Sequence, residues 1–236
     1  LLNTSGGYNS AFGAEALDGN TTGTENTAVG YQSLSASLTG SSNSAVGNYA
    51  LATVTTGTDN TALGRNAGDG ITTGSQNVAI GRHALSSNSA ANDNVAIGFY
   101  ALKVNTTGLQ NVGVGNSALG GNTTASFNTA IGFRSLSQNT TGGKNVAVGY
   151  YALDANTTAE NNTAVGYHAL HANSTGTRNT ALGQSAGEAV TTGSYNTAVG
   201  ALSLTDCTTG TLNTACGDVA LYQLTTGERN TAVGQQ

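Results

Sequence analysis

The chain has 236 residues, of which only 8% are charged, and its formal net charge at pH 7 is −5. Seven Lys and Arg residues are too few for the basic stripe that nucleic-acid binding requires, and no apolar run approaches membrane-spanning length. So little charge with few large apolar residues is typical of disordered segments, but a strict internal period argues against disorder.

The period is set by an asparagine that returns at every seventeenth position without insertion or deletion. A fixed period of this kind is the signature of a repeat architecture. We number the columns of the repeat from this asparagine, which is column one. It occurs at Asn9, Asn26, Asn43, Asn60, Asn77, Asn94, Asn111, Asn128, Asn145, Asn162, Asn179, Asn196, Asn213 and Asn230.

Columns two to four predict a short strand. Column two is Val, Thr or Ser, column three is Ala except at Gly113, and column four is aliphatic except at Phe12 and Cys216. Alternation places columns two and four on one face, and we expect this larger apolar face to form the core, with Ala outside. The predicted core row is Val29, Val46, Leu63, Ile80, Ile97, Val114, Ile131, Val148, Val165, Leu182 and Val199.

Column five is Gly in every copy, which predicts a corner with positive φ or a close approach of backbone. Column nine is Leu in every complete copy except two, which have Gly68 and Gly187 there. In those two copies column twelve, usually Asn, becomes Ile71 or Val190. This exchange indicates that columns nine and twelve line the same interior. Columns thirteen to fifteen read Thr-Thr-Gly in most copies and predict a second short extended stretch.

These elements predict an all-β fold: one parallel β-solenoid domain over residues 1–236, with about fourteen 17-residue coils. A helix with an invariant Gly and frequent Thr-Thr-Gly would be poor. Equal columns would stack about 4.8 Å apart. We expect ladders of Asn in column one and Thr in column fourteen to hydrogen-bond between coils.

Two motifs resemble known repeats. Asn-Val-Ala-Ile-Gly (residues 77–81) and Asn-Thr-Ala-Val-Gly-Tyr (residues 26–31) resemble the head repeats of YadA-like trimeric autotransporter adhesins. Ala-Gly-Asp-Gly-Ile-Thr-Thr-Gly (residues 67–74) is similar to repeats of phage tail fibres with an endosialidase-type chaperone domain. The resemblance implies a left-handed β-roll, three chains side by side and a role in surface attachment. The adhesin heads usually have a shorter period.

No residue pattern predicts catalysis, a cofactor or a metal site. His83, His168 and His171 lie in variable columns without a third ligand at metal-site spacing, and acidic residues in column ten are sporadic. Cys207 in column twelve and Cys216 in column four are expected to be small core residues, with a disulfide between adjacent coils as the alternative.

Most Asn-Xaa-Ser/Thr sequons fall in column twelve, where aliphatic residues also occur, so we expect these asparagines to point inward. The sequons start at Asn3, Asn20, Asn105, Asn122, Asn139, Asn156, Asn161 and Asn173. Thr-Gly-Thr at Thr22, Thr56, Thr175 and Thr209 is similar to the threonine arrays of ice-binding solenoids, although other residues interrupt the array.

Most aromatic residues lie in columns six and seven. We expect them to form contacts between chains, and a sugar-binding strip is the alternative. They are Tyr31, Tyr49, Phe99, Tyr100, Phe133, Tyr150, Tyr151 and Tyr167.

The sequence therefore favours a non-enzymatic, extracellular fibre segment on a cell surface or virion, either an adhesin head or a tail-fibre shaft. A carbohydrate- or ice-binding module and a self-assembling filament subunit are the alternatives. Neither end of the chain has an atypical capping repeat. We therefore expect a homo-oligomer, a trimer or an end-to-end filament, with a host-surface or glycan ligand as a further partner.

Overall fold

A computed structural model describes residues 5–36 and 38–235. The chain divides into two compact units, Leu1–Ser117 and Ala118–Gln236, and each is taken by itself below. The sequon at Asn3 lies outside the described residues.

Each coil contributes one three-residue strand, formed by columns two to four. The first unit holds β1 (Ser10–Phe12), β2 (Thr27–Val29), β3 (Ser44–Val46), β4 (Thr61–Leu63), β5 (Val78–Ile80), β6 (Val95–Ile97) and β7 (Val112–Val114). The second unit holds β8 (Thr129–Ile131), β9 (Val146–Val148), β10 (Thr163–Val165), β11 (Thr180–Leu182), β12 (Thr197–Val199), β13 (Thr214–Cys216) and β14 (Thr231–Val233).

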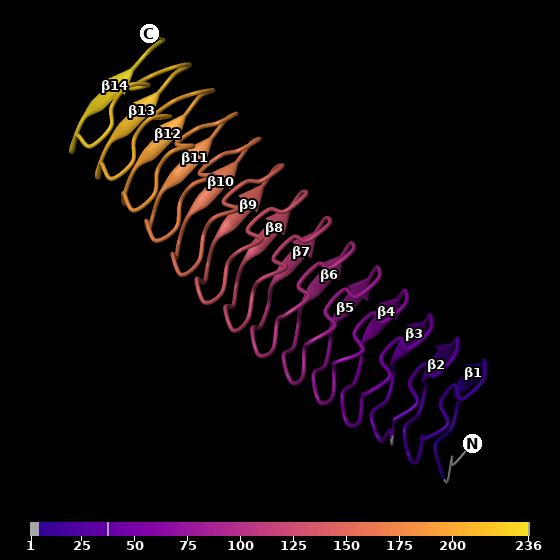
Figure 1. Cartoon of the computed structure of the whole chain (residues 1–236). Helices are drawn as coiled ribbons and strands as arrows, with labels where there is room; N and C mark the ends of the chain where they lie inside the picture. Colours follow the sequence, from indigo (N-terminus) through magenta and orange to yellow (C-terminus); the bar gives the residue numbers. More distant parts are fainter. Residues whose placement is uncertain (1–4, 37, 236) are drawn as a thin grey trace. The chain divides into compact units, whose positions relative to one another are not determined.

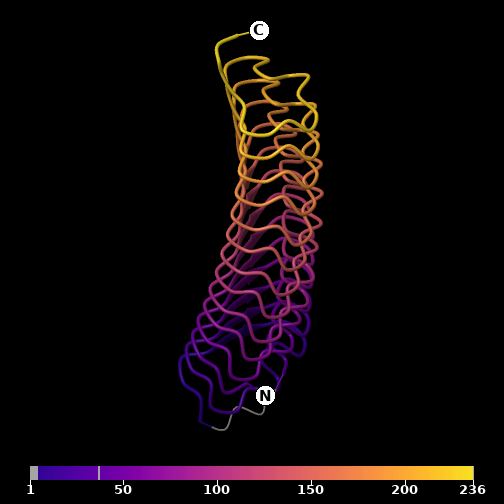
Figure 2. The ribbon, with the colours of Figure 1, turned by 90° about the vertical axis from the view of Figure 1, so that its left-hand side faces the viewer.

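Within each unit, neighbouring strands pair in parallel and in register, always seventeen residues apart. Thr27 pairs with Ser44 in the first unit, and Thr163 pairs with Thr180 in the second. Figure 1 shows the strands following one another in chain order, and Figure 2 shows that successive coils of a unit repeat the same path. The predicted parallel β-solenoid of 17-residue coils is confirmed.

The predicted orientation of the strands is wrong for a single chain. Column three points inward: Ala28, Ala45 and their equivalents are buried, whereas columns two and four are half-buried or exposed. None of the eleven predicted core residues is buried: Val29, Val46, Leu63, Ile80, Ile97, Val114, Ile131, Val148, Val165, Leu182 and Val199 all lie on the outward face.

The interior is narrow, which explains why the small residue points inward. The column-nine leucines cross it from the opposite side; Leu51, Leu102 and Leu153 are fully buried. A Cβ at Gly68 would lie 3.7 Å from the Cβ of Ala79, so columns three and nine face each other. A Val or Ile opposite each Leu would overfill this space.

Columns nine and twelve do line the same interior, as predicted. A Cβ at Gly68 would lie 3.1 Å from Cδ1 of Ile71, which fills the space left by the missing leucine. The column-twelve asparagines are also buried, which confirms their inward direction. They are Asn20, Asn88, Asn105, Asn122, Asn139, Asn156 and Asn173.

The invariant Gly of column five meets both predicted conditions. At Gly47 φ is +135°, and a Cβ there would lie 2.5 Å from the carbonyl oxygen of Gly64 in the next coil. No L-residue with a side chain fits this combination of dihedral and contact.

Two further expectations need correction. In the described residues, columns thirteen to fifteen form no strand, although backbone hydrogen bonds such as Thr39 N–H to Thr55 O at 2.7 Å still link the coils. The threonine ladder lies in column thirteen, not fourteen: the hydroxyl of Thr140 donates to the carbonyl of Thr157 at 3.0 Å. The asparagine ladder of column one is confirmed, for example by Asn26 N–H to Asn9 Oδ1 at 2.8 Å.

The two cysteines differ. Cys207 is buried, as predicted, but Cys216 is exposed because it lies in column four. Both thiols are free, so the alternative of a disulfide is wrong in this structure.

Candidate functional site: the strand face and its two edges

The strands present an outward side to solvent, which we call the strand face and define as columns two and four. It carries Thr, Ser or Val in column two and mostly Val, Ile or Leu in column four. The exposed fractions of Leu63 in the first unit and Ile131 in the second are 49% and 41%. A row of outward aliphatic side chains such as column four is uncommon on a soluble monomer.

Columns six and seven follow the Gly corner and form what we call the corner edge of the strand face. All eight aromatic residues singled out from the sequence lie here. Five have exposed side chains, namely Tyr31, Phe99, Phe133, Tyr150 and Tyr167, and the half-buried ones are Tyr49, Tyr100 and Tyr151. The structure places them at the surface, where an inter-chain contact or a ligand can reach them.

The aromatics form two small groups in the first unit and one larger group in the second. Tyr31 packs edge-on against Tyr49 with ring centroids 5.4 Å apart, and the ring centroids of Phe99 and Tyr100 lie 3.9 Å apart. In both groups the rings come from column six or seven of the same or adjacent coils.

In the second unit the column-six rings form a stack. The centroids of Phe133 and Tyr150 are 5.3 Å apart, and those of Tyr150 and Tyr167 are 5.4 Å apart with an interplanar angle of 3°. The rings therefore cover one another's faces and present their edges outward. Sugar rings stack on aromatic faces, so this geometry is poorly suited to the carbohydrate strip considered from the sequence.

Ionisable groups surround this stack. Nε of Arg134 lies 3.8 Å from Oδ1 of the buried Asp154, and its guanidinium carbon lies 5.0 Å from the centroid of Tyr151. Nδ1 of His168 lies 3.2 Å from Oε1 of Glu188. Desolvation by the neighbouring rings, and then the nearby phenols of Tyr151 and Tyr167, raise the pKa of the Tyr150 phenol above its ordinary value.

The opposite side of the strand face is formed by column seventeen, which we call the turn edge. Every residue there has φ between 55° and 65°, a left-handed turn that points the side chain outward. The turn edge is Tyr8, Glu25, Ser42, Asp59, Gln76, Asp93 and Gln110 in the first unit, and Phe127, Lys144, Asn161, Arg178, Tyr195, Leu212 and Arg229 in the second.

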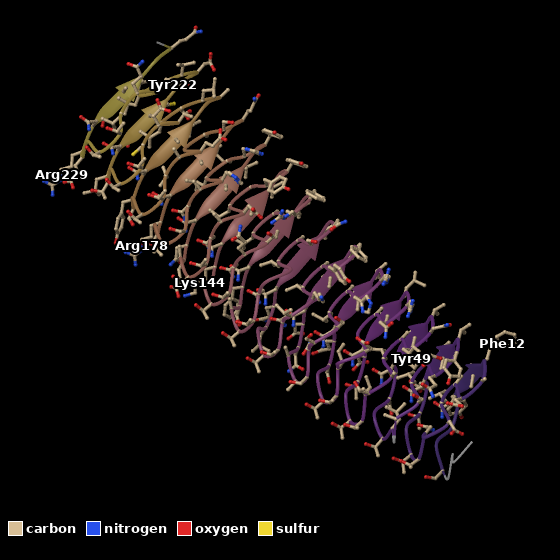
Figure 3. All side chains as sticks on the ribbon, viewed as in Figure 1. Phe12, Tyr49, Lys144, Arg178, Tyr222 and Arg229 are labelled. Atoms are coloured by element: carbon tan, nitrogen blue, oxygen red, sulfur yellow. The ribbon has the colours of Figure 1, made fainter. Side chains whose placement is uncertain are left out.

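The charges of the turn edge have one sign in each unit. Those of the first unit are acidic, Glu25, Asp59 and Asp93, and those of the second are basic, Lys144, Arg178 and Arg229. Figure 3 shows the three basic side chains on the same edge of the second unit. We did not identify this pattern from the sequence, although reading column seventeen alone would have revealed it.

Column fourteen forms a separate outward row of threonines on the return stretch of the coil. The exposed members are Thr22, Thr39, Thr56, Thr73 and Thr107 in the first unit and Thr124, Thr141, Thr158, Thr175, Thr192, Thr209 and Thr226 in the second. Column sixteen is less free, since the hydroxyl of Ser41 accepts from the backbone N–H of Thr24 at 3.0 Å.

The described residues contain no group of three or more His, Cys, Asp or Glu side chains that could hold a metal ion. Nor does any helix in the described part of the chain have the length and apolar character needed to span a membrane.

Comparison of the chain with family models, with curated proteins and with solved structures gives no match. Functional inference therefore depends on the geometry of the strand face and its edges.

Proposed function

We propose that the chain is a structural segment of an extracellular fibre, on a cell surface or a virion, whose copies associate side by side through the strand face. The observation that carries this proposal is the aliphatic row of column four, which faces outward and is half-buried or exposed although the coil already has a core of Ala, Leu and Asn. A second copy of the chain presents the same apolar face and can cover it.

The energetics favour association along many coils. Full burial of an aliphatic side chain contributes about 1.5–3 kcal/mol, and those of column four are already partly covered. Association costs an estimated 4–15 kcal/mol in lost freedom of movement, so a single coil would not suffice. The row of a whole unit, with one such side chain per coil, is long enough to offset this cost.

The resemblance of the repeat to adhesin heads and tail-fibre shafts supports three copies per fibre and a role in surface attachment. In that role the chain works as a rigid scaffold, which presents repeated side chains to a host surface or a glycan. Copies joined end to end into a filament are compatible with the same lateral contact.

Analytical ultracentrifugation tests the proposal. We expect a species of about three times the chain mass of 23.3 kDa. Ile131→Asp with Leu182→Asp puts charges on the strand face and should produce monomers, whereas Thr141→Asp with Thr192→Asp, in the same coils but on column fourteen, should not. A monodisperse 23.3 kDa wild-type species that is stable on dilution overturns the proposal.

Ice binding is the second candidate, because the threonine row of column fourteen is exposed and regularly spaced. An ice-recrystallisation assay decides it: inhibition by the wild type that is lost in Thr175→Leu with Thr192→Leu would favour this function. A glycan array tests the carbohydrate alternative, for which specific binding should be lost on mutating Tyr100 and Tyr151.

A further inference from the structure

We infer that the two edges of the strand face are a complementary pair, and that the turn edge of one copy lies against the corner edge of a second, parallel copy. This inference rests on the proposed lateral association and adds to it the direction of the chains and the residues in contact. It begins with the position of the edges, because column seventeen lies just before the strand and columns six and seven just after it.

Two apolar faces that meet in parallel bring unlike edges together. If the chains run antiparallel, face to face, each edge meets its own equivalent. An antiparallel pair that joins two first units would place the acidic turn edge, with Glu25, Asp59 and Asp93, against another acidic edge, whereas one that joins a first unit to a second unit would place it against the basic turn edge. Like charges in contact cost several kcal/mol, so turn-edge charge disfavours only the first of these two arrangements. The parallel arrangement follows from the proposed three copies, because copies related by a threefold axis all run in the same direction.

The corner edge of the first unit carries two arginines against one acidic residue, Glu15. Arg65 and Arg82 lie in column six and are exposed, as are Asp59 and Asp93 on the turn edge. Arg65 follows Asp59 by six residues, about a third of a coil, so copies in register hold them within about 2 Å in height. Arg82 precedes Asp93 by eleven residues, so copies in register hold these two residues within about 3 Å in height. Glu25 is level with the uncharged Tyr31 and Gln32, but the exposed Glu15 in column seven precedes it by ten residues, so this coil adds no attraction.

The second unit shows complementarity with other chemistry, although Arg134 on its corner edge lies ten residues before Lys144 and is itself paired with Asp154. Lys144 is six residues before Tyr150, and Arg229 is eleven residues after Asp218 on the corner edge. A cation over an aromatic ring and an ion pair are therefore level in a parallel pair of copies. Arginines already adopt such contacts within the chain: the guanidinium carbon of Arg178 lies 5.3 Å from the ring centroid of Tyr195.

A hollow on the turn edge of the second unit fits a side chain of the partner. It has a volume of about 210 Å³, and its lining includes Phe127, Lys144, Glu160 and the column-fourteen residues Thr124 and Thr141. The hollow exists because column sixteen holds Gly143, which has no side chain to fill it. A Cβ at Gly143 would lie 3.0 Å from the carbonyl oxygen of Ser126 and would have no other neighbour within 4 Å. The partner's aromatic corner edge, at the height of Phe133 and Tyr150, is its counterpart.

Charge reversal tests the pairing in the full chain by sedimentation velocity over a dilution series. Arg65→Glu with Arg82→Glu, or Asp59→Lys with Asp93→Lys, should raise the dissociation constant of the oligomer at least about tenfold. The four substitutions together restore opposite charges and should return it to within about threefold of wild type. As a matched control, Lys at Thr22, Thr39, Thr56 and Thr73 adds the same charge as the aspartate variant and should leave assembly unchanged.

Salt dependence of the wild type provides a second measurement that needs no variant. Weaker assembly at 500 mM than at 50 mM salt is expected, because exposed ion pairs are screened. The inference is overturned if the Arg65→Glu/Arg82→Glu and Asp59→Lys/Asp93→Lys variants fold, by circular dichroism, and still assemble like wild type. Assembly that does not depend on salt overturns it as well. In either case the proposed lateral association still stands; a monomeric wild type overturns both.

Discussion

Oδ1 of Asn26 accepts two hydrogen bonds from Asn43 of the next coil, one from its backbone N–H at 2.9 Å and one from its Nδ2 at 3.2 Å. The same Nδ2 donates to the carbonyl of Gly57 at 2.9 Å. One buried side chain thus connects the coil below with the return stretch of its own coil. This explains why column one admits no other residue.

Removing one member of this ladder should be costly. Asn60→Ala would leave the carbonyl of Gly74 and the N–H of Asn77 without their partner, and it would remove one of the two hydrogen bonds that Oδ1 of Asn43 accepts from residue 60. Each buried polar group left unsatisfied costs about 1–3 kcal/mol, so we expect a loss of about 3–5 kcal/mol in the free energy of unfolding, measured by urea denaturation. The exposed Asn48→Ala, in the preceding coil, is the control and should stay within about 0.5 kcal/mol.

The corner glycines should be intolerant of alanine. At Gly183 φ is +138° and a Cβ would lie 2.5 Å from the carbonyl oxygen of Gly200, so Gly183→Ala should destabilise by about 3 kcal/mol or more. Gly187, four residues on, has φ +60°, where other coils hold leucine, and its Cβ would lie 3.1 Å from Cδ2 of Leu170. Gly187→Ala should therefore destabilise by only about 1–2 kcal/mol, the cost of a left-handed φ for a residue with a side chain. Equal effects at the two positions would contradict this account.

These glycines mark what the sequence could predict. The period, the corner and the shared interior of columns nine and twelve follow from residue identity alone, because Gly68 and Ile71 change together. The direction of the strand does not. A three-residue strand has one residue on one face and two on the other, and hydrophobicity favours burying Val and Leu over Ala.

The width of the interior instead requires Ala to point inward, because leucines such as Leu85 already fill the space from across the coil. The sequence of one chain also does not reveal whether an apolar row packs in the core or against a second copy. The corner edge was found because aromatic residues are conspicuous. The turn edge was missed because its residues vary in type and share only a position and a left-handed φ.

The exchange between columns nine and twelve predicts a double-mutant cycle in the first unit. Gly68→Leu alone brings a side chain against Cδ2 of Leu51 and Cδ1 of Ile71, and overpacking should cost about 1–3 kcal/mol. Ile71→Asn alone removes a buried side chain and should cost about 2–5 kcal/mol. Together they recreate the commonest coil and should lie within about 1 kcal/mol of wild type. Simple additivity of the two losses would show that the columns are independent.

The two thiols give a readout of the strand face that requires no substitution. Cys216 is exposed in column four, whereas Cys207 is buried, and burial raises the pKa of its thiol. The thiolate is the reactive form, so a raised pKa leaves less of it at any pH below that value, and access to Cys207 is also blocked. A thiol reagent at pH 8 should therefore label one cysteine per folded monomer and two after denaturation.

The oligomer should differ from the monomer at Cys216 alone. If copies cover the strand face, labelling of Cys216 should slow at least about tenfold at protein concentrations where the oligomer predominates, and recover on dilution. Cys207 should remain slow at both concentrations, and it serves as the internal control for folding. Labelling of Cys216 at one rate across the whole dilution series, while sedimentation shows an oligomer, would place the contact between copies on a different face of the coil.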